Sequence, residues 1–138
     1  MRRSVMISAL LAVFFVCFHV ACAKEQDEDL IINLPTDGAK VPERPIVEGY
    51  VKDSNAQVWV VVHPMETGDY WVQPRVTVRN NGLWRVQIYI GRPGSIDVDK
   101  HFEIKAVANP NEPLSEGNVL GMWPEAQLQS EIIEVIRE

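Results

Sequence analysis

The sequence predicts an all-β protein, namely a single antiparallel β-sandwich of about seven strands that follows an N-terminal signal peptide. Short runs rich in Val, Ile, Tyr and Trp recur about every ten residues, and Gly, Pro, Asn and Asp separate them. This rhythm is typical of sandwiches and barrels. The chain has 138 residues, of which 46% are hydrophobic, so it can supply one domain with one core.

The N-terminus has the features of an export signal. Arg2 and Arg3 precede a mostly apolar stretch at residues 5–20, and the small residues Ala-Cys-Ala follow at 21–23. A basic start, an apolar middle and a small-residue exit are typical of a secretory signal peptide. The apolar stretch is shorter than the roughly 20 residues of a spanning helix, which makes a retained membrane anchor the less favoured alternative.

Two cleavage sites fit this signal. Residues 20–22 (Val-Ala-Cys) resemble a bacterial lipobox, whose cysteine becomes the lipidated first residue of the mature protein, although His19 stands where that motif has an aliphatic residue. Cleavage after Ala23, at an A-x-A site, would instead release a chain starting at Lys24. We expect Cys22 to be the lipid attachment site, with the free secreted form as the alternative.

These features divide the chain into a signal peptide at 1–21, a charged tether at 22–29 and a sandwich domain at 30–138. The tether carries Lys-Glu-Gln-Asp-Glu-Asp at 24–29, with no apolar side chain, so we expect it to be solvated. Acyl chains on Cys22 would anchor the protein at an extracytoplasmic membrane surface in the cell envelope. Without them it would be a soluble secreted or periplasmic protein.

The first half of the domain contains four strand runs. Residues 30–34 lead into a Pro-Thr-Asp-Gly turn, where Gly38 permits a positive φ. Residues 46–51 alternate in polarity, as a half-buried strand does. Residues 57–63 are apolar on both faces, which is expected of a central strand covered on both sides. A proline interrupts residues 70–78 and predicts two edge-like segments there.

The second half begins with Asn-Asn-Gly at 80–82, which predicts a hairpin with a type I′ turn. Residues 84–90 alternate between apolar and polar side chains, so one face should be core and the other solvated. Residues 102–108 repeat this pattern, with Glu103 and Lys105 expected on the solvated face.

The last segment, residues 127–138, has the Glu and Gln content of a helix. Its centre at 132–136 is dominated by β-branched residues, which lose side-chain freedom in helices and favour strands. We therefore predict a final strand. The total of about seven strands matches the size of an immunoglobulin-like sandwich.

Six short motifs occur in order along the domain. They are Leu-Pro-Thr-Asp-Gly at 34–38, Val-Trp-Val-Val-Val-His-Pro at 58–64, Tyr-Trp-Val-Gln-Pro at 70–74, Gly-Leu-Trp at 82–84, Tyr-Ile-Gly at 89–91 and Phe-Glu-Ile-Lys-Ala-Val at 102–107. This succession resembles a bacterial immunoglobulin-like domain, an accessory module of many otherwise unrelated bacterial proteins. The resemblance covers about residues 30–137 and implies a sandwich without catalytic activity.

The net charge and the cysteine content limit the kinds of binding partner that the sequence predicts. The formal net charge is −6, so the chain lacks the basic footprint that nucleic-acid backbones require, and nucleic acid is excluded as a predicted partner. Cys17 lies in the apolar stretch and Cys22 at its exit, so the mature domain is expected to have no disulfide. The expected partners are the membrane, through the lipid on Cys22, and an unknown protein or glycan.

Three exposed aromatic residues are candidates for ligand binding. Tyr70 and Trp71 precede the proline-broken edge and could form a platform on which the face of a sugar stacks. Tyr89 points outward from its strand beside polar residues, and exposed tyrosines are common in interfaces. The other tryptophans are assigned to the core or to fastening a loop: Trp59, Trp84 and Trp123.

No metal, cofactor or catalytic site is predicted. Asp97, Asp99 and His101 would point to one side of an extended segment, but two carboxylates are too few for calcium. Only one other histidine, His63, follows the signal, which is too few nitrogen ligands for zinc. No nucleophile elbow or phosphate-binding loop is present in the sequence.

The sequence therefore predicts a binding or scaffolding module of the cell envelope that is not an enzyme and whose ligand is undefined. One alternative is a carbohydrate-binding module that uses its exposed aromatic residues. Another is a subunit of an envelope complex, joined through an edge strand at 71–78 or 131–137.

Overall fold

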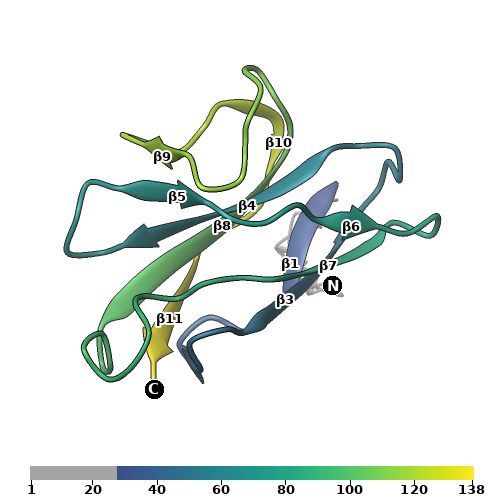
Figure 1. Cartoon of the computed structure of the whole chain (residues 1–138). Coiled ribbons are helices and arrows are strands. Elements are labelled where there is room, and N and C mark those ends of the chain that lie inside the picture. Colours follow the sequence, from purple (N-terminus) through teal and green to yellow (C-terminus); the bar gives the residue numbers. More distant parts are fainter. Residues whose placement is uncertain (1–27) are drawn as a thin grey trace, which may run out of the picture.

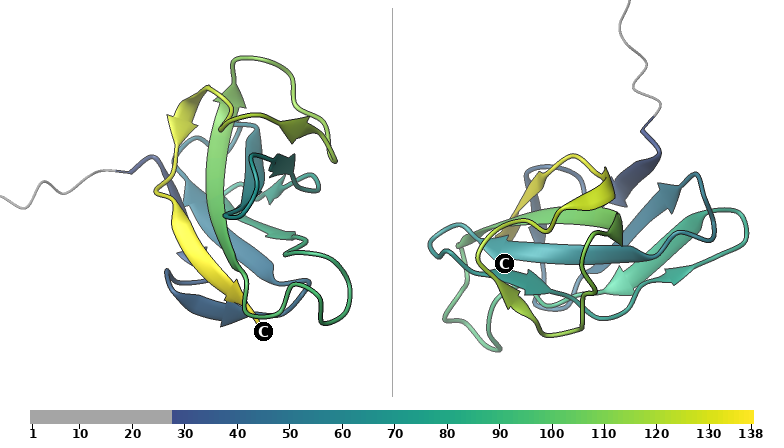
Figure 2. Two further views of the ribbon diagram at one scale, coloured as in Figure 1. Left: turned by 90° about the vertical axis from the view of Figure 1, so that its left-hand side faces the viewer. Right: turned by 90° about the horizontal axis from the view of Figure 1, so that it is seen from above.

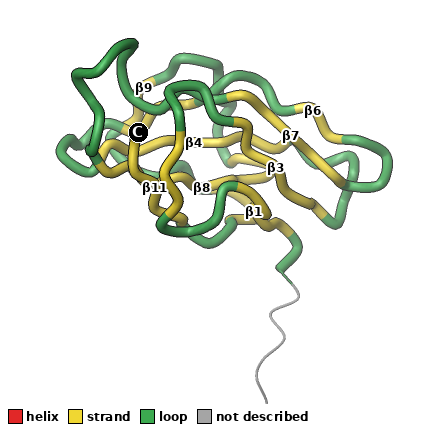
Figure 3. The backbone as a smooth tube through the Cα atoms, turned by 90° about the horizontal axis from the view of Figure 1, so that it is seen from below, coloured by secondary structure: helices red, strands yellow, loops and turns green. Residues whose placement is uncertain are grey.

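The computed structural model describes residues 28–138, and in this part of the chain all regular structure is β-strand (Figures 1 and 3). The described residues include no helix long and apolar enough to span a membrane. The predicted signal peptide, the lipid attachment site Cys22 and most of the tether lie outside the described residues.

The smaller of two sheets has four antiparallel strands in the order β1-β3-β7-β6. They are β1 (Leu30–Leu34), β3 (Ile46–Val51), β7 (Leu83–Gln87) and β6 (Thr77–Val78). Four of the predicted strand runs contribute to this sheet. In the run at 70–78, the part after Pro74 crosses to the smaller sheet and ends in the short edge strand β6.

The larger sheet has seven strands in the order β2-β11-β8-β4-β5-β9, and β10 also pairs with β8. They are β2 (Ala39–Val41), β11 (Ile133–Arg137), β8 (His101–Pro110), β4 (Val58–Pro64), β5 (Tyr70–Val72), β9 (Val119–Leu120) and β10 (Ala126–Gln129). All neighbours are antiparallel except β2 and β11, which are parallel.

The strand order is that of an immunoglobulin-like sandwich. The order β1-β3-β7-β6 corresponds to the A-B-E-D sheet, and β11-β8-β4 corresponds to G-F-C. The two sheets face each other as layers (Figure 2), and the chain crosses between them after β1, β2, β3, β5 and β7. The predicted all-β sandwich is therefore confirmed. It has eleven strands rather than seven, because three short strands carry no periodic pattern and residues 70–78 supply two.

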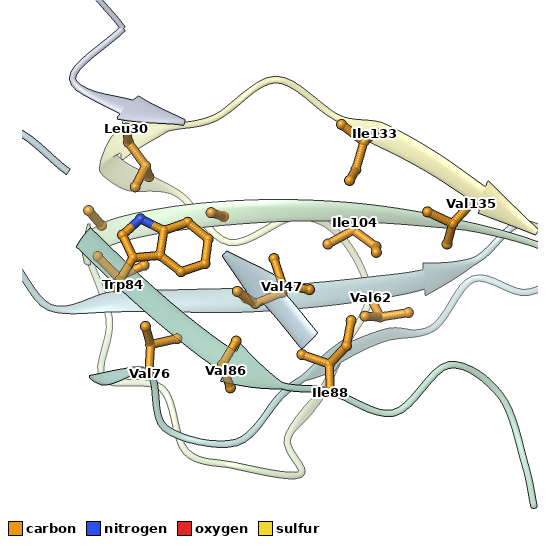
Figure 4. Packing of buried hydrophobic residues seen from close by; sticks show 14 of the residues in the cluster. Leu30, Val47, Val62, Val76, Trp84, Val86, Ile88, Ile104, Ile133 and Val135 are labelled. Carbon is orange, nitrogen blue, oxygen red and sulfur yellow. The ribbon is translucent and has the colours of Figure 1, made fainter. Parts of the chain in front are cut away.

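The core lies between the two sheets and consists of aliphatic side chains with Phe102 and the indole of Trp84 (Figure 4). Trp84 on β7 is 2% exposed, as the alternation predicted. Gly49 on β3 makes room for it, because a Cβ at Gly49 would lie 2.2 Å from Trp84 Cζ2 and 2.1 Å from the carbonyl oxygen of Ile31. Only glycine fits at this position, because the indole and the backbone of β1 leave no room for a Cβ atom.

A second cluster covers the outer face of the larger sheet. Trp59 on β4 is buried as predicted, but it lies on this outer face with Val107 rather than between the sheets. Trp123, in the connection between β9 and β10, packs against the cluster and fastens that connection. The prediction of a solvated face was therefore wrong at Lys105, which is 9% exposed.

Two local predictions need correction. The hairpin at 80–82 forms, but only Gly82 has a positive φ and its N–H donates to the carbonyl of Arg79, so the turn is not type I′. Strand β7 ends at Gln87, whereas the alternation predicted a strand to residue 90. Ile88 and Ile90 are nevertheless fully buried, and their N–H groups donate to the carbonyls of Pro45 and Glu43 in the connection between β2 and β3.

The two ends of the sandwich are distinct. The chain enters at Leu30, which pairs with Val51, next to the β3–β4 turn. It leaves at the opposite end, where Arg137 N donates to the carbonyl oxygen of Lys100 (3.0 Å) (Figure 2). We call this opposite end, with the β4–β5 hairpin and residues 88–100, the C-terminal end.

Candidate functional site

A pocket of about 610 Å³ lies at the C-terminal end of the described part of the protein. Its walls are the β4–β5 hairpin and β5, the segment at 89–102, and residues 116–117 before β9. Val62 and Phe102 belong to the inner face of the larger sheet, so the pocket lies where that face extends past the smaller sheet. Its volume is in the range of small-molecule sites.

Two of the three predicted ligand-binding residues line this pocket. Trp71 is 42% exposed and lies on β5, paired with Val62 of β4. Tyr89 is 50% exposed and follows β7, a strand of the other sheet. The fold thus brings together two exposed aromatic rings that belong to different layers of the sandwich.

Tyr70 lies on the other side of β5. Its ring stacks on His63 at a centroid distance of 4.1 Å and meets the edge of Trp123 at 4.8 Å. Successive side chains of a strand point to opposite faces, so Tyr70 joins the outer cluster while Trp71 faces the pocket. The shared platform of Tyr70 and Trp71 expected from the sequence is therefore not formed.

A buried glutamine connects the two aromatic residues of the pocket. Gln73 is 4% exposed; its Nε2 donates to the carbonyl of Trp71 (3.2 Å), and its Oε1 accepts from the N–H of Tyr89 (2.8 Å). Its own N–H donates to the carbonyl of Val60. Because a buried amide is costly unless it is hydrogen-bonded, these bonds fix the backbone on both sides of the pocket.

Arg44 fixes the ring of Tyr89. The guanidinium carbon lies 3.6 Å from the centroid of that ring, and Nε donates to the carbonyl of Ile88 (3.1 Å). A cation–π contact of this kind holds an exposed ring in place. The two residues that position the rings, Gln73 and Arg44, were not singled out by the sequence, because their partners are distant along the chain.

The charged wall of the pocket is organised around Asp97, which is 5% exposed. Its carboxylate accepts from the backbone N–H of Arg92 (2.7 Å) and from both Nε and Nη2 of the same residue, and it pairs with Lys100 (3.2 Å). The hydrogen bonds from Arg92 hold the pKa of the Asp97 carboxyl well below its usual range. The bond to Asp97 likewise raises the pKa of Arg92 and of Lys100.

The three residues weighed as metal ligands do not converge. Asp97 faces Arg92, while Asp99 lies in a turn with φ 68° and its N–H donates to the carbonyl of Arg137. His101 contacts Glu134 through Nδ1 and Oε1 (2.5 Å). Within residues 28–138, no three His, Cys, Asp or Glu side chains are grouped so that they could hold a metal ion.

Arg137 on β11 anchors the loop that carries this wall. Its buried guanidinium donates from Nη1 to the carbonyls of Ile90 (2.8 Å) and Arg92 (3.0 Å), and from Nη2 to that of Gly94 (2.7 Å). Glu43 lies 3.6 Å from Nη2 and balances part of the charge. A single buried cation therefore satisfies three loop carbonyls, as a buried charge requires.

A second polar group lies in the outer cluster. Lys105 Nζ donates to Gln129 Oε1 and lies 5.6 Å from the ring centroid of Trp123. Burial lowers the pKa of Lys105. His63 Nδ1 and Glu103 Oε1 are 2.8 Å apart nearby. These contacts fasten the β9–β10 connection to the sheet.

The strand edges differ from the expected ones. Residues 133–137 form β11, which lies between β2 and β8 and is not an edge. Strand β5 is covered by β9, whereas β6 is the edge of the smaller sheet. Of the two edge segments expected for a partner, only part of 71–78 is therefore exposed for pairing.

Comparison with known proteins gave no match: no family model, no curated protein and no solved structure is significantly similar to this chain. The resemblance to bacterial immunoglobulin-like accessory domains therefore depends on the sequence motifs alone.

Proposed function

We propose that this protein is a non-catalytic binding module of the bacterial cell envelope, held at an extracytoplasmic membrane surface by acyl chains on Cys22. One observation carries the binding role: the exposed rings of Trp71 and Tyr89 share a pocket, and buried Gln73 hydrogen-bonds to the backbone of both residues. Rings held in place before binding lose little entropy when a ligand arrives, which favours affinity.

The charges of the pocket support binding rather than catalysis. Asp97, Arg92 and Lys100 bond to one another, and Glu66 lies 3.4 Å from Lys100. A general acid or base needs a pKa near the working pH, whereas Arg92 drives the pKa of Asp97 away from that range. These side chains stabilise the pocket wall.

The position of the pocket also suits an anchored protein. The tether joins β1 at one end of the sandwich, and the pocket lies at the other end. Seven residues lie between Cys22 and Leu30, and the eight steps along the chain reach at most about 28 Å. An anchor at Cys22 would therefore present the pocket away from the membrane.

Carbohydrate is the ligand class that the rings favour most. A sugar ring has an apolar face that packs on an aromatic side chain, and Trp and Tyr combine that apolar surface with a polar group. Trp71 and Tyr89 offer two such surfaces at one pocket. The test is a titration of the purified domain with a panel of oligosaccharides, followed by tryptophan fluorescence and calorimetry.

We expect a binding saccharide to change the fluorescence of the native protein and Trp71→Ala to weaken its binding at least tenfold, as for a central aromatic contact. The matched control is Trp123→Ala, which removes a tryptophan from the outer cluster and should leave binding within about twofold. Loss of binding in the control alone would place the ligand on the outer face and contradict the proposal.

Attachment is tested separately by the intact mass of the N-terminal peptide from protein extracted from its native membranes. Acyl chains on Cys22 are the expected result, and Cys22→Ala should move the protein into the soluble fraction. An unmodified start at Lys24 would leave a soluble secreted module, and a retained Met1 would make residues 5–20 a membrane anchor.

A role as a subunit of an envelope complex is favoured by one feature, the free edge at β6. This strand is two residues long, and within residues 28–138 it pairs only with β7. A partner strand could extend the smaller sheet there. Val78→Pro would remove a backbone donor at that edge, so co-purification of a partner with the native protein but not with this variant is the expected result for this second function.

A further inference from the structure

We propose that the ligand of the pocket is a glycan bearing free amino groups, recognised as a cation by the carboxylates of Asp69 and Glu116 while its ring packs on Trp71. This inference rests on the proposed binding function of the same pocket and adds the charge of the ligand. Three observations carry it: the excess of carboxylates around the pocket, the internal pairing of its cations, and the fixed aromatic rings.

The pocket is lined by four carboxylates and two permanent cations. Both cations are engaged within the wall, since Arg92 bonds to Asp97 (2.9 Å) and Lys100 pairs with Asp97 (3.2 Å) and Glu66 (3.4 Å). His101, also in the lining, contacts Glu134. Among the lining residues, an anionic ligand would have to break these pairs to find a positive partner.

Asp69 and Glu116 are the remaining carboxylates. Both are exposed, and across residues 28–138 no basic side chain lies within ion-pair distance of either. Asp69 ends the β4–β5 hairpin two residues before Trp71, and Glu116 lies in the loop whose next residue, Gly117, donates to the carbonyl of Val72. The two carboxylates therefore line the same pocket as Trp71 from two separate segments.

An amino sugar can use both the exposed ring of Trp71 and the carboxylates of Asp69 and Glu116. Its ring presents an apolar face to an indole, and its protonated amine can pair with a carboxylate or lie over an aromatic face. A neutral sugar uses only the rings, whereas a simple polyamine uses only the charges. Arg44 already occupies one face of the Tyr89 ring, so we place the sugar ring on Trp71, which is 42% exposed.

The experiment compares three probes on the full mature chain at mildly acidic pH and low salt: a glucosamine trisaccharide, its N-acetylated form and trilysine. The two saccharides share one body and differ in charge, and trilysine carries the charge without the sugar. We expect the glucosamine trisaccharide to bind roughly tenfold more tightly than its neutral form, because two exposed ion pairs each contribute about a two- to fivefold effect. Added salt should reduce that preference.

Two double variants test which carboxylates cause the preference for the amino form. The double variant Asp69→Asn/Glu116→Gln should bring the amino form to the affinity of the acetylated form and leave the latter unchanged. The matched control, Glu112→Gln/Glu125→Gln, removes two exposed carboxylates that do not line the pocket, and it should keep the preference within about twofold. Circular dichroism and the unfolding midpoint confirm that each variant is folded.

The outcomes separate the two proposals. If the neutral trisaccharide binds as tightly as the amino form and both depend on Trp71, the charge inference is overturned and the binding function stands. If trilysine binds as tightly as the amino sugar, the ligand is a basic peptide and the amino-sugar inference is overturned. If no probe of either kind binds, the inference fails, and the wider oligosaccharide panel decides the binding function independently.

Discussion

The larger sheet is covered on both faces, and the two coverings differ in composition and in origin. Its inner face packs against the smaller sheet through aliphatic side chains, Phe102 and Trp84. Its outer face is covered by the irregular connection between β8 and β11, and there Trp59 and Val107 lie beside the polar side chains of Lys105 and Glu103. One covering is a second sheet and the other is a loop.

The difference predicts how each face responds to damage. Strands of both sheets contribute to the inner cluster, so a defect there should lower the free energy of unfolding of the whole domain. The outer cluster connects one loop to the sheet, so a defect there should mainly open that loop. Four predictions test this contrast, from the largest expected effect to the smallest.

Trp84→Ala should have the largest effect. It removes a fully buried indole from the inner cluster and should lower the free energy of unfolding by about 4 kcal/mol. Urea denaturation followed by circular dichroism measures this. Trp84→Phe, which keeps an aromatic ring, should cost clearly less, and equal costs for the two variants would mean that the ring volume is not what stabilises the core.

Asp97→Asn tests the C-terminal end of the inner face, where the pocket wall rather than the smaller sheet covers the larger sheet. Arg92 holds the pKa of this carboxyl low in the folded state, compared with about 3.9 in an unfolded chain. Its stabilisation is therefore complete above about pH 4 and is lost as the pH falls toward the folded-state pKa. At pH 7 the variant should be less stable by about 2 kcal/mol, and the difference should narrow below pH 4.

The control for this prediction is Asp99→Asn, at an exposed position with positive φ where asparagine is well tolerated. It should change stability by less than about 0.5 kcal/mol at any pH. An acid profile of Asp97→Asn parallel to that of the native protein would show that other carboxylates govern acid stability.

Trp123→Ala tests the outer face. Its ring is half-buried against Tyr70 and His63, so the global cost should be about 1.5 kcal/mol, less than half that of Trp84→Ala. Hydrogen exchange should accelerate at residues 111–125 and stay unchanged in β3 and β7. Equal acceleration in both sheets would mean that the two faces form one cooperative unit.

Lys105→Met should have the smallest effect and the opposite sign. Burial lowers the folded-state pKa of Lys105 below the unfolded value of about 10.4, so the protonated folded form carries a penalty that disappears as the pH rises through this window. At pH 7 the variant should be more stable by up to about 1 kcal/mol, and this gain should vanish above pH 10.4.

Lys40→Met is the matched control, because Lys40 is exposed on β2 and should tolerate the change with little effect. A loss of stability in Lys105→Met at pH 7 would show that the contacts of Lys105 with Gln129 and Trp123 outweigh its desolvation.

Much of the fold was predictable because strand alternation is a local property. The runs at 30–34, 46–51, 57–63 and 102–108 all coincide with strands to within one or two residues, and the final segment is a strand. Strands β2, β9 and β10 were missed, since two to four residues without alternation carry no periodic signal. The type I′ turn was wrong because the Asn-Asn-Gly sequence also suits a turn in which only the glycine has a positive φ.

The pocket was only half predictable. Trp71 and Tyr89 were recognised as exposed aromatic residues, but nothing local indicates that they share a cavity, and Tyr70 was expected beside Trp71 although it faces the opposite side. Gln73 and Arg137 carry no sequence signal, since their hydrogen-bond partners lie 16 and 47 residues away.

By itself the sequence determined which segments become strands and which side chains alternate toward a core, because both follow from the two-residue period of an extended chain. It also determined the net charge and the features of an export signal. Only the tertiary structure decided what covers each face, with a sheet inside and a loop outside, and where the inner face remains open. The physical reason is that periodicity assigns a side chain to a face, whereas the neighbour that covers that face comes from distant parts of the chain.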